Sequence, residues 1–148
     1  MNITIGSDHG AVALKDEVKM VLKEYEDIKV TDVGTFGTES VDYPDIAEKV
    51  CADVTSGKAD FGIVLCGTGI GISIAANKVK GIRCALLDNP MSARLTREHN
   101  DTNMMALGAA VTGEMLALEI VDVWLDTAFS GVERHQRRID KVMAYENA

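Results

Sequence analysis

The feature that most constrains the fold is a regular alternation between short apolar runs and segments of helical periodicity. Each run of strand length is followed by a segment with apolar residues three or four positions apart, the pattern of an amphipathic helix. The expected strands are 3–6, 28–33, 61–65, 83–87 and 104–107. Regular alternation of this kind implies right-handed crossovers and parallel strands. The sequence therefore predicts an α/β fold, a Rossmann-like three-layer αβα sandwich with a five-stranded parallel sheet.

The third run, Phe61 to Leu65, is continuously apolar, which predicts a central strand covered on both faces. The chain has 148 residues, two prolines and no low-complexity linker, so one domain over residues 1–148 is expected. A last helix, about 134–145, is a candidate for packing against a partner subunit. In the helix expected over 113–125, the side chains expected to face inward are Leu116, Ile120, Val123 and Trp124.

The formal net charge of −8 disfavours nucleic acid or an anionic membrane as a partner, because both attract a basic surface. No apolar stretch has the length of a membrane span. The cluster Arg134 to Arg138 is the basic exception, and local positive charge of this kind suits a small anion such as a phosphate. Three irregularly spaced cysteines and an N-terminus without a signal-peptide pattern predict free thiols and a cytoplasmic location.

The strongest candidate site is the segment Cys66 to Gly71, which follows the central strand directly. The Cys66 thiol is expected to face the start of the next helix, where backbone amides stabilise a thiolate. Glycines in the turn let amides approach a ligand closely enough to hold an oxyanion or a phosphate. A buried inert cysteine is the alternative, and we expect it for Cys51 and Cys84. A simple tight turn remains the alternative for the glycines.

Three known glycine-loop patterns do not fit this segment. A dinucleotide fingerprint requires Gly or Ala where Ile72 stands, and a P-loop starting at Gly62 requires Lys where Thr68 stands. A cysteine-phosphatase loop requires Arg at position 72, which is again Ile72. The turn therefore predicts a small-ligand site of another kind.

Further candidates are two histidines and two arginines. Asp8-His9 follows the first strand and His99-Asn100 ends the fourth helix; in one crevice with a cysteine, the histidines could act as acid/base groups or metal ligands. No tight metal-binding spacing is present, so no metal is expected. Arg134 and Arg138 share one helical face, which fits a phosphate clamp, although a solvated basic face is the alternative.

With these pieces placed, the chain resembles the sugar-phosphate isomerase family that contains type B ribose-5-phosphate isomerases and galactose-6-phosphate isomerases. The resemblance runs nearly end to end. It is carried by the motifs Gly6-Ser7-Asp8-His9-Gly10, Asp42-Tyr43-Pro44, Cys66 to Lys78, Arg97-Glu98-His99-Asn100-Asp101 and Arg134-His135-Gln136-Arg137-Arg138.

The resemblance implies aldose–ketose isomerisation through an enediolate, without a metal or organic cofactor. It implies that Cys66 is the base, that Thr68 with loop amides stabilises the oxyanion, and that His99 opens the sugar ring with help from Asp8. The residues that would bind the phosphate are His9, Arg134 and Arg138. Those that would shape the sugar pocket are Tyr43, Gly67, Thr68, Gly69, Ile70, Gly71 and Asn100. Family members are dimers with sites at the subunit interface, so a homodimer or a dimer of dimers is expected.

Two departures from the family pattern bear on the substrate. Ala110 stands where ribose-type members carry an arginine, and residues 131–134 contain one residue more than usual. The expected substrates are ribose 5-phosphate and ribulose 5-phosphate, in the pentose phosphate pathway. A hexose 6-phosphate, of allose or galactose, is the alternative because Ala110 leaves room. A non-catalytic sugar-phosphate-binding module and a thiol-dependent hydrolase are alternatives of other classes; Cys66 beside Thr68 disfavours the first, and Ile72 the second.

Overall fold

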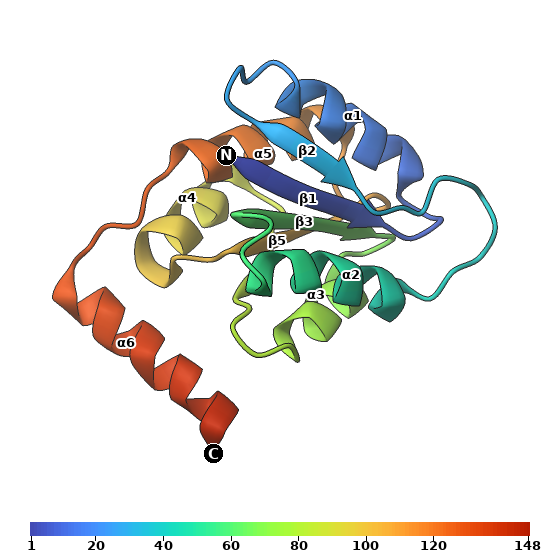
Figure 1. Ribbon diagram of the computed structural model, residues 1–148. Coiled ribbons are helices and arrows are strands. Elements are labelled where there is room, and N and C mark those ends of the chain that lie inside the picture. The colour runs from blue at the N-terminus through green and yellow to red at the C-terminus, as the bar shows by residue number, and fades with distance from the viewer.

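The fold is a parallel sheet between two layers of helices, described by a computed structural model of all 148 residues (Figure 1). The strands are β1 (Asn2–Ser7), β2 (Lys29–Asp32), β3 (Phe61–Cys66), β4 (Cys84–Leu86) and β5 (Met104–Gly108). The helices are α1 (Val12–Leu22), α2 (Tyr43–Thr55), α3 (Ile70–Asn77), α4 (Pro90–Asn100), α5 (Glu114–Asp126) and α6 (Glu133–Ala144), followed by a short 3₁₀ turn (Tyr145–Asn147). The strand order β2-β1-β3-β5-β4 confirms the expected α/β sandwich and the central place of β3.

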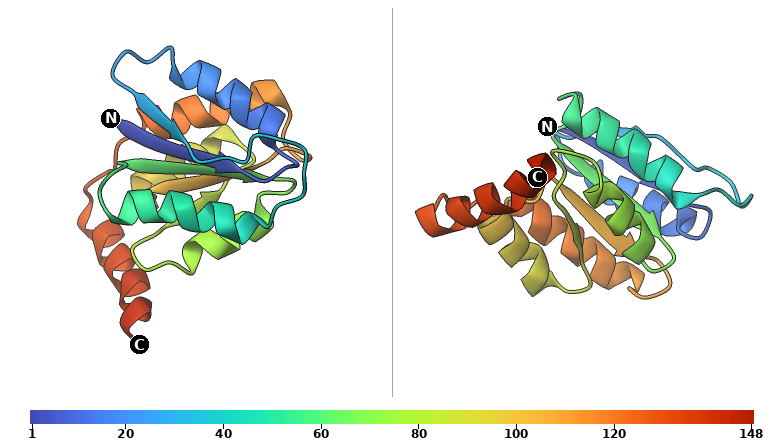
Figure 2. Two further views of the ribbon diagram at one scale, coloured as in Figure 1. Left: turned by 45° about the vertical axis from the view of Figure 1, so that its right-hand side comes forward. Right: turned by 90° about the horizontal axis from the view of Figure 1, so that it is seen from below.

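The two faces of the sheet bury separate cores. Helices α1, α4 and α5 cover one face and α2 and α3 the other, whereas α6 stands away from both layers (Figure 2). Strand β3 serves both cores, since Ile63 and Leu65 point to the first and Val64 and Cys66 to the second. This alternation follows from the two-residue period of a strand, and it explains why β3 is apolar throughout. None of the helices has both the length and the apolar character that crossing a membrane requires.

The strand order places a topological switch point between the carboxyl ends of β1 and β3. These strands are neighbours, but the helices that follow them, α1 and α3, lie on opposite faces of the sheet. The Asp8 amide bridges the two strand ends by donating to the Leu65 carbonyl at 3.1 Å. Ligands of open α/β sheets bind at such switch points.

The inward face of α5 differs from the one expected. Leu116 is exposed and Val123 only partly buried, whereas Ala117, Ile120, Val121 and Trp124 are buried. These four residues follow the helical spacing i, i+3, i+4 and i+7 and therefore form one stripe toward the sheet. The expectation for Leu116 was wrong because α5 has two apolar stripes, one that contains Leu116 and one that contains Ala117. Contact with the sheet decides which of the two is buried.

A buried ion pair stabilises the segment that follows β2. Lys15 of α1 has no exposed side-chain surface, and its Nζ lies 2.9 Å from Asp32 Oδ1 and 2.5 Å from the Thr35 carbonyl. Lys19 Nζ lies 2.7 Å from the other Asp32 oxygen. Burial alone would raise the pKa of Asp32, but the bonds from Lys19 and Lys15 and from the Gly34 amide hold it below its ordinary value.

We expect Asp32→Asn to lower the free energy of unfolding at pH 7 by about 3 kcal/mol, because it leaves the Lys15 charge buried without a partner. The Asp32 contribution is fully present above its unfolded-state pKa of about 3.9 and is lost as pH falls through the lowered folded-state pKa. Urea unfolding of both proteins should therefore show a difference that shrinks below about pH 4. The control is Asp16→Asn, whose carboxylate is largely exposed and 3.6 Å from Lys19. A difference independent of pH would contradict the ion-pair explanation.

Candidate active site

Cys66 ends β3 at the switch point, and its sulfur contacts the turn that starts α3. The side chain is almost fully buried, and the Gly69 amide donates a hydrogen bond to Sγ at 3.1 Å. Gly69 adopts a left-handed φ of 74°, which glycine tolerates and which aims its N–H back at the sulfur. An amide directed at sulfur from a helix start is the environment of functional thiolates.

The other two cysteines have a different environment. Cys51 lies on the buried face of α2 and Cys84 at the start of β4, and both are free thiols. Burial raises the pKa of the Cys51 thiol to about 11 and that of Cys84 further still. Both cysteines are therefore suited to packing, as the sequence suggested.

The Cys66 turn is closely packed against the end of β5. The amides of Ala109 and Ala110 donate to the carbonyls of Cys66 and Gly67 at 3.0 and 2.8 Å. A Cβ added to Gly108 would collide with the carbonyl of Thr68, so only glycine allows this approach. The turn is thus held from its neighbouring strand as well as by its own helix.

Residues that follow β1 and the first residue of α2 complete this side of the switch point. The chain after Asp8 approaches the turn, since a Cβ on Gly10 would lie 3.9 Å from the Gly67 nitrogen. Asp8 Oδ1 accepts the Gly10 amide at 2.9 Å, and Nδ1 of the exposed His9 accepts the Val41 amide at 3.2 Å. The Tyr43 ring lies against Gly71, where a Cβ would be 2.6 Å from Tyr43 Cζ. We call this set the carboxyl-edge group: Asp8, His9, Tyr43, Cys66, Gly67, Thr68, Gly69, Ile70 and Gly71.

The remaining candidates form a second set, around the end of α4 and the start of α6. The ring centroids of His99 and His135 are 4.3 Å apart, and Ser130 Oγ lies 2.8 Å from His135 Nδ1. Burial lowers the pKa of His135, and the neighbouring charges of His99, Arg134 and Arg138 lower it further. We call this set the amino-edge group: His99, Asn100, Arg134, His135 and Arg138.

A cavity of about 720 Å³ lies beside this second set, between α6, the end of α4 and the turn from α3 to β4. Asn100 and Arg138 both line it, whereas Arg134 is exposed on the first turn of α6. Sequence reasoning assigned no role to His135; its place inside the motif of 134–138 was the available signal.

Within one chain the two groups lie at opposite edges of the sheet. Helix α4 begins beyond the carboxyl end of β4 and returns toward the amino ends, so His99, its second-last residue, lies about 14 Å from the start of the helix. In Figure 1 the strand arrowheads point away from the side on which α6 is attached. The structure therefore brings Asp8, His9, Tyr43 and Cys66 together, but it does not place His99 beside them in the same chain.

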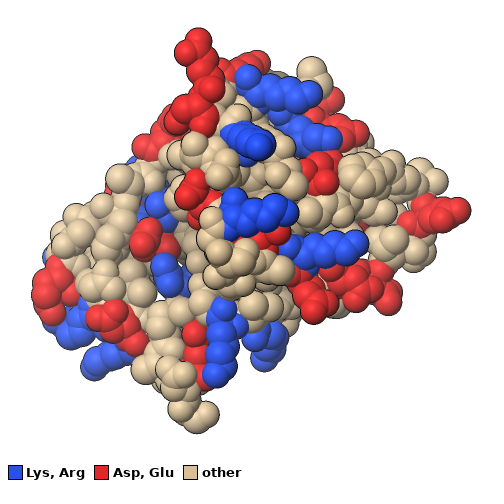
Figure 3. All heavy atoms as spheres, in the orientation of Figure 1, with Lys and Arg blue, Asp and Glu red and all other residues tan.

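The surface charge is mixed. On the face shown in Figure 3, acidic and basic side chains are interspersed, and neither sign forms an extended stripe. No group of three or more His, Cys, Asp or Glu side chains is arranged to hold a metal ion.

Comparisons with known proteins agree with this architecture. A family model described as Ribose/Galactose Isomerase matches residues 3–142. Ribose-5-phosphate isomerase B of Escherichia coli is 46% identical over 144 residues, which cover 97% of this chain and 95% of that protein. The structure of Clostridium thermocellum ribose-5-phosphate isomerase B has a TM-score of 0.96 and 54% identity, covering 99% of this chain and 98% of that one.

A ribose-5-phosphate isomerase B of Mycoplasma genitalium, solved with bound ribulose-5-phosphate, has a TM-score of 0.92 and 40% identity, covering 99% of this chain and 96% of that one. The resemblance inferred from the ordered motifs is thereby confirmed. On the extent of the family match and on these identities, the chain belongs to the ribose/galactose isomerase family.

Proposed function

We propose that this chain interconverts ribose 5-phosphate and ribulose 5-phosphate, with residues 1–148 acting as one isomerase domain in pentose phosphate metabolism. The observation that carries the proposal is the Cys66 sulfur at the end of β3, 3.1 Å from the Gly69 amide. Relatives named for this activity, one of them with ribulose-5-phosphate bound, support the choice of a pentose.

In the proposed reaction, the Cys66 thiolate removes the proton from C2 of the open-chain aldose. The electrons of that C–H bond form a C1–C2 double bond, and the carbonyl oxygen at C1 becomes an enediolate oxyanion. Cys66 then delivers its proton to C1, while the proton of the C2 hydroxyl passes to the C1 oxygen, which gives the ketose with a hydroxyl at C1 and a carbonyl at C2. No redox partner is needed because one carbon is oxidised as its neighbour is reduced.

Thr68 is proposed to stabilise the enediolate together with the amides of the turn. Its Oγ1 accepts the Ile70 amide at 3.2 Å, which leaves the hydroxyl proton available for the substrate oxygen. The Thr68 side chain is exposed rather than packed into the core. Donors held in place before the reaction stabilise a developing oxyanion without reorganisation.

We infer that each active site combines the carboxyl-edge group of one chain with the amino-edge group of a second copy. The edge that holds the base lacks the ring-opening histidine and the arginine pair, and the other edge carries both. Large apolar side chains are exposed beside each group: Ile70 and Ile74 on α3, and Val142 on α6 with Tyr145 in the 3₁₀ turn that follows. Exposed apolar surface of this kind marks protein contacts. This supports a homodimer with two equivalent sites, from which a dimer of dimers can assemble.

We further propose a cytoplasmic location, because all three cysteines are buried free thiols. The proposed substrates of the assembled enzyme are small sugar phosphates.

The assay compares kcat/KM of the purified protein on ribose 5-phosphate, allose 6-phosphate and galactose 6-phosphate. We expect the pentose to be preferred by about tenfold or more. The extra carbon of a hexose moves the phosphate farther from C1 and C2, so the contacts at the phosphate and those at the reacting carbons cannot both be kept. Preference for a hexose would contradict the substrate assignment. Binding without turnover would instead favour a binding module, and release of inorganic phosphate a hydrolase.

A further inference from the structure

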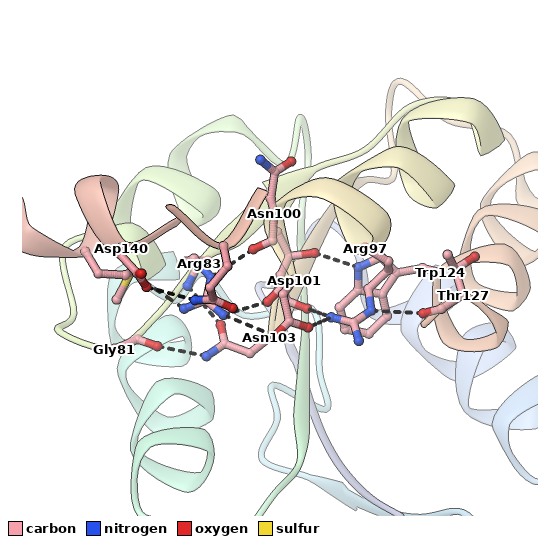
Figure 4. Close-up of polar contacts among 12 residues, drawn as sticks. Gly81, Arg83, Arg97, Asn100, Asp101, Asn103, Trp124, Thr127 and Asp140 are labelled. Carbon is pink, nitrogen blue, oxygen red and sulfur yellow. Dashed lines mark hydrogen bonds and ion pairs between the residues drawn. The ribbon is translucent and has the colours of Figure 1, made fainter. Parts of the chain in front are cut away.

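Arg83 connects three elements near the amino-edge group, although neither the fold nor the proposed chemistry has assigned it a role. It lies just before β4, and its side chain is about one-fifth exposed. Nε donates to the Asn100 carbonyl at 3.0 Å and one terminal nitrogen to the Asp101 carbonyl at 2.7 Å (Figure 4). The other terminal nitrogen lies 3.6 Å from Met143 Sδ on α6.

The two carbonyls that Arg83 binds belong to the end of α4, where backbone acceptors have no partner within the helix. The helix stops at Asp101, which adopts a left-handed φ of 43°. A guanidinium at this position satisfies the acceptors and complements the negative end of the helix dipole. His99 and Asn100 are the last two residues of the helix, so their orientation depends on how this end is fixed.

Arg83 is itself held rigidly. Its amide donates to Asn103 Oδ1 at 2.8 Å, and Asn103 Nδ2 donates to the Gly81 carbonyl at 2.8 Å (Figure 4). The Arg83 carbonyl accepts the Met104 amide at 3.2 Å. The backbone of Arg83 is therefore fixed relative to the sheet, and its guanidinium holds the end of α4 in place relative to the sheet.

A second arginine, Arg97, contacts the same turn from the core side. It bonds to Asp101 Oδ1 at 2.9 Å, and its guanidinium lies over the rings of Phe61 and Trp124. Arg97 is buried in the first core, whereas Arg83 lines the cavity that Asn100 and Arg138 also line. Arg83 is thus the member of this network that faces the functional groups.

We propose that Arg83 is a positioning residue that fixes the end of α4 and thereby orients His99 for opening the sugar ring. The inference rests on the proposed isomerase function and adds to it a residue that does not touch the substrate. Lysine is a poor substitute, because its ammonium group lacks the planar set of N–H donors with which arginine binds two carbonyls at once.

The test is a double-mutant cycle on ribose 5-phosphate with Arg83→Met, His99→Ala and the double variant. We expect Arg83→Met to lower kcat by about 10- to 100-fold, since small displacements of reacting groups have effects of this size. In the His99→Ala background the same change should lower kcat by less than about twofold, because Arg83 acts through His99. The kcat of Arg83→Lys should lie between that of Arg83→Met and that of the unmodified protein.

Arg137→Gln is the matched control, because this exposed arginine of α6 pairs only with Glu133 and should leave kcat unchanged. Urea midpoints establish that each variant is folded, and Arg83→Lys replaces Arg83→Met in the cycle if the latter is not. An equal loss in both backgrounds would show a merely structural role and overturn the proposal. Absence of ribose 5-phosphate turnover in the unmodified protein would instead overturn the proposed function. A His99→Ala protein with the kcat of the unmodified enzyme would remove the ring-opening role through which Arg83 acts and so overturn the proposal.

Discussion

Replacing Cys66 with alanine is expected to lower kcat for ribose 5-phosphate by about 10³-fold, the scale of a lost general base. The methyl group retains the Cβ but removes the sulfur that accepts the Gly69 amide, so no group at the end of β3 can take the C2 proton. KM should change by no more than about threefold, because the phosphate contacts proposed for His9, Arg134 and Arg138 remain. Initial rates of ribulose 5-phosphate formation measure both parameters.

The control is Cys51→Ala. The Cys51 sulfur lies in the second core near the Ala76 carbonyl and Met104, away from the carboxyl-edge group, so only stability should fall. In D₂O the unmodified enzyme should introduce solvent deuterium into the product, and Cys66→Ala should lose this exchange in step with turnover. A Cys66→Ala protein that keeps more than about a tenth of the activity would remove Cys66 as the base.

Mixing two variants of strongly reduced activity, Cys66→Ala and His99→Ala, is expected to restore about one quarter of the unmodified activity. When subunits exchange at random, about half of the dimers are hybrids. In each hybrid, one site combines both mutated residues, and the other combines an intact Cys66 with an intact His99. Coexpression with two affinity tags allows the hybrid to be purified and its kcat measured directly.

A second pair of variants, with both changes in the carboxyl-edge group, is the control that distinguishes a shared site from a site within one chain. Asp8 and Cys66 both lie in the carboxyl-edge group, so hybrids of Asp8→Ala with Cys66→Ala contain no intact site and should stay inactive. Purified hybrids of Cys66→Ala with His99→Ala that show no activity would rule out the two-chain site. The contrast between the two pairs depends only on which edge of the sheet each residue occupies.

Much of the fold could be predicted from local patterns. The α3 helix begins at Ile70 and ends at Asn77 as expected, and β3 extends the expected run by only one residue, Cys66. Apolar spacing and glycine positions determine such elements, because they depend on neighbours along the chain. Leu116 shows the limit of prediction from local patterns. Two apolar stripes on α5 satisfy the same pattern, and only contact with the sheet selects the one that is buried.

Part of the candidate site could be predicted for the same reason. Cys66 and its glycine turn are contiguous, and the closeness of Asp8 follows once β1 and β3 are neighbours in a parallel sheet. Arg83 carried no comparable signal. Its importance arises from two carbonyls 17 and 18 residues away, which no spacing rule relates to it.

By itself, the sequence determined the order of strands and helices, the identity of the thiol turn and the motifs shared with the family, because all of these are properties of residues close together in the chain. Only the tertiary structure decided that Cys66 and His99 lie at opposite edges of the sheet. The direction of each strand and the return of each crossover helix set that separation. Both depend on how whole elements pack against one another, and no pattern of neighbouring residues specifies that packing.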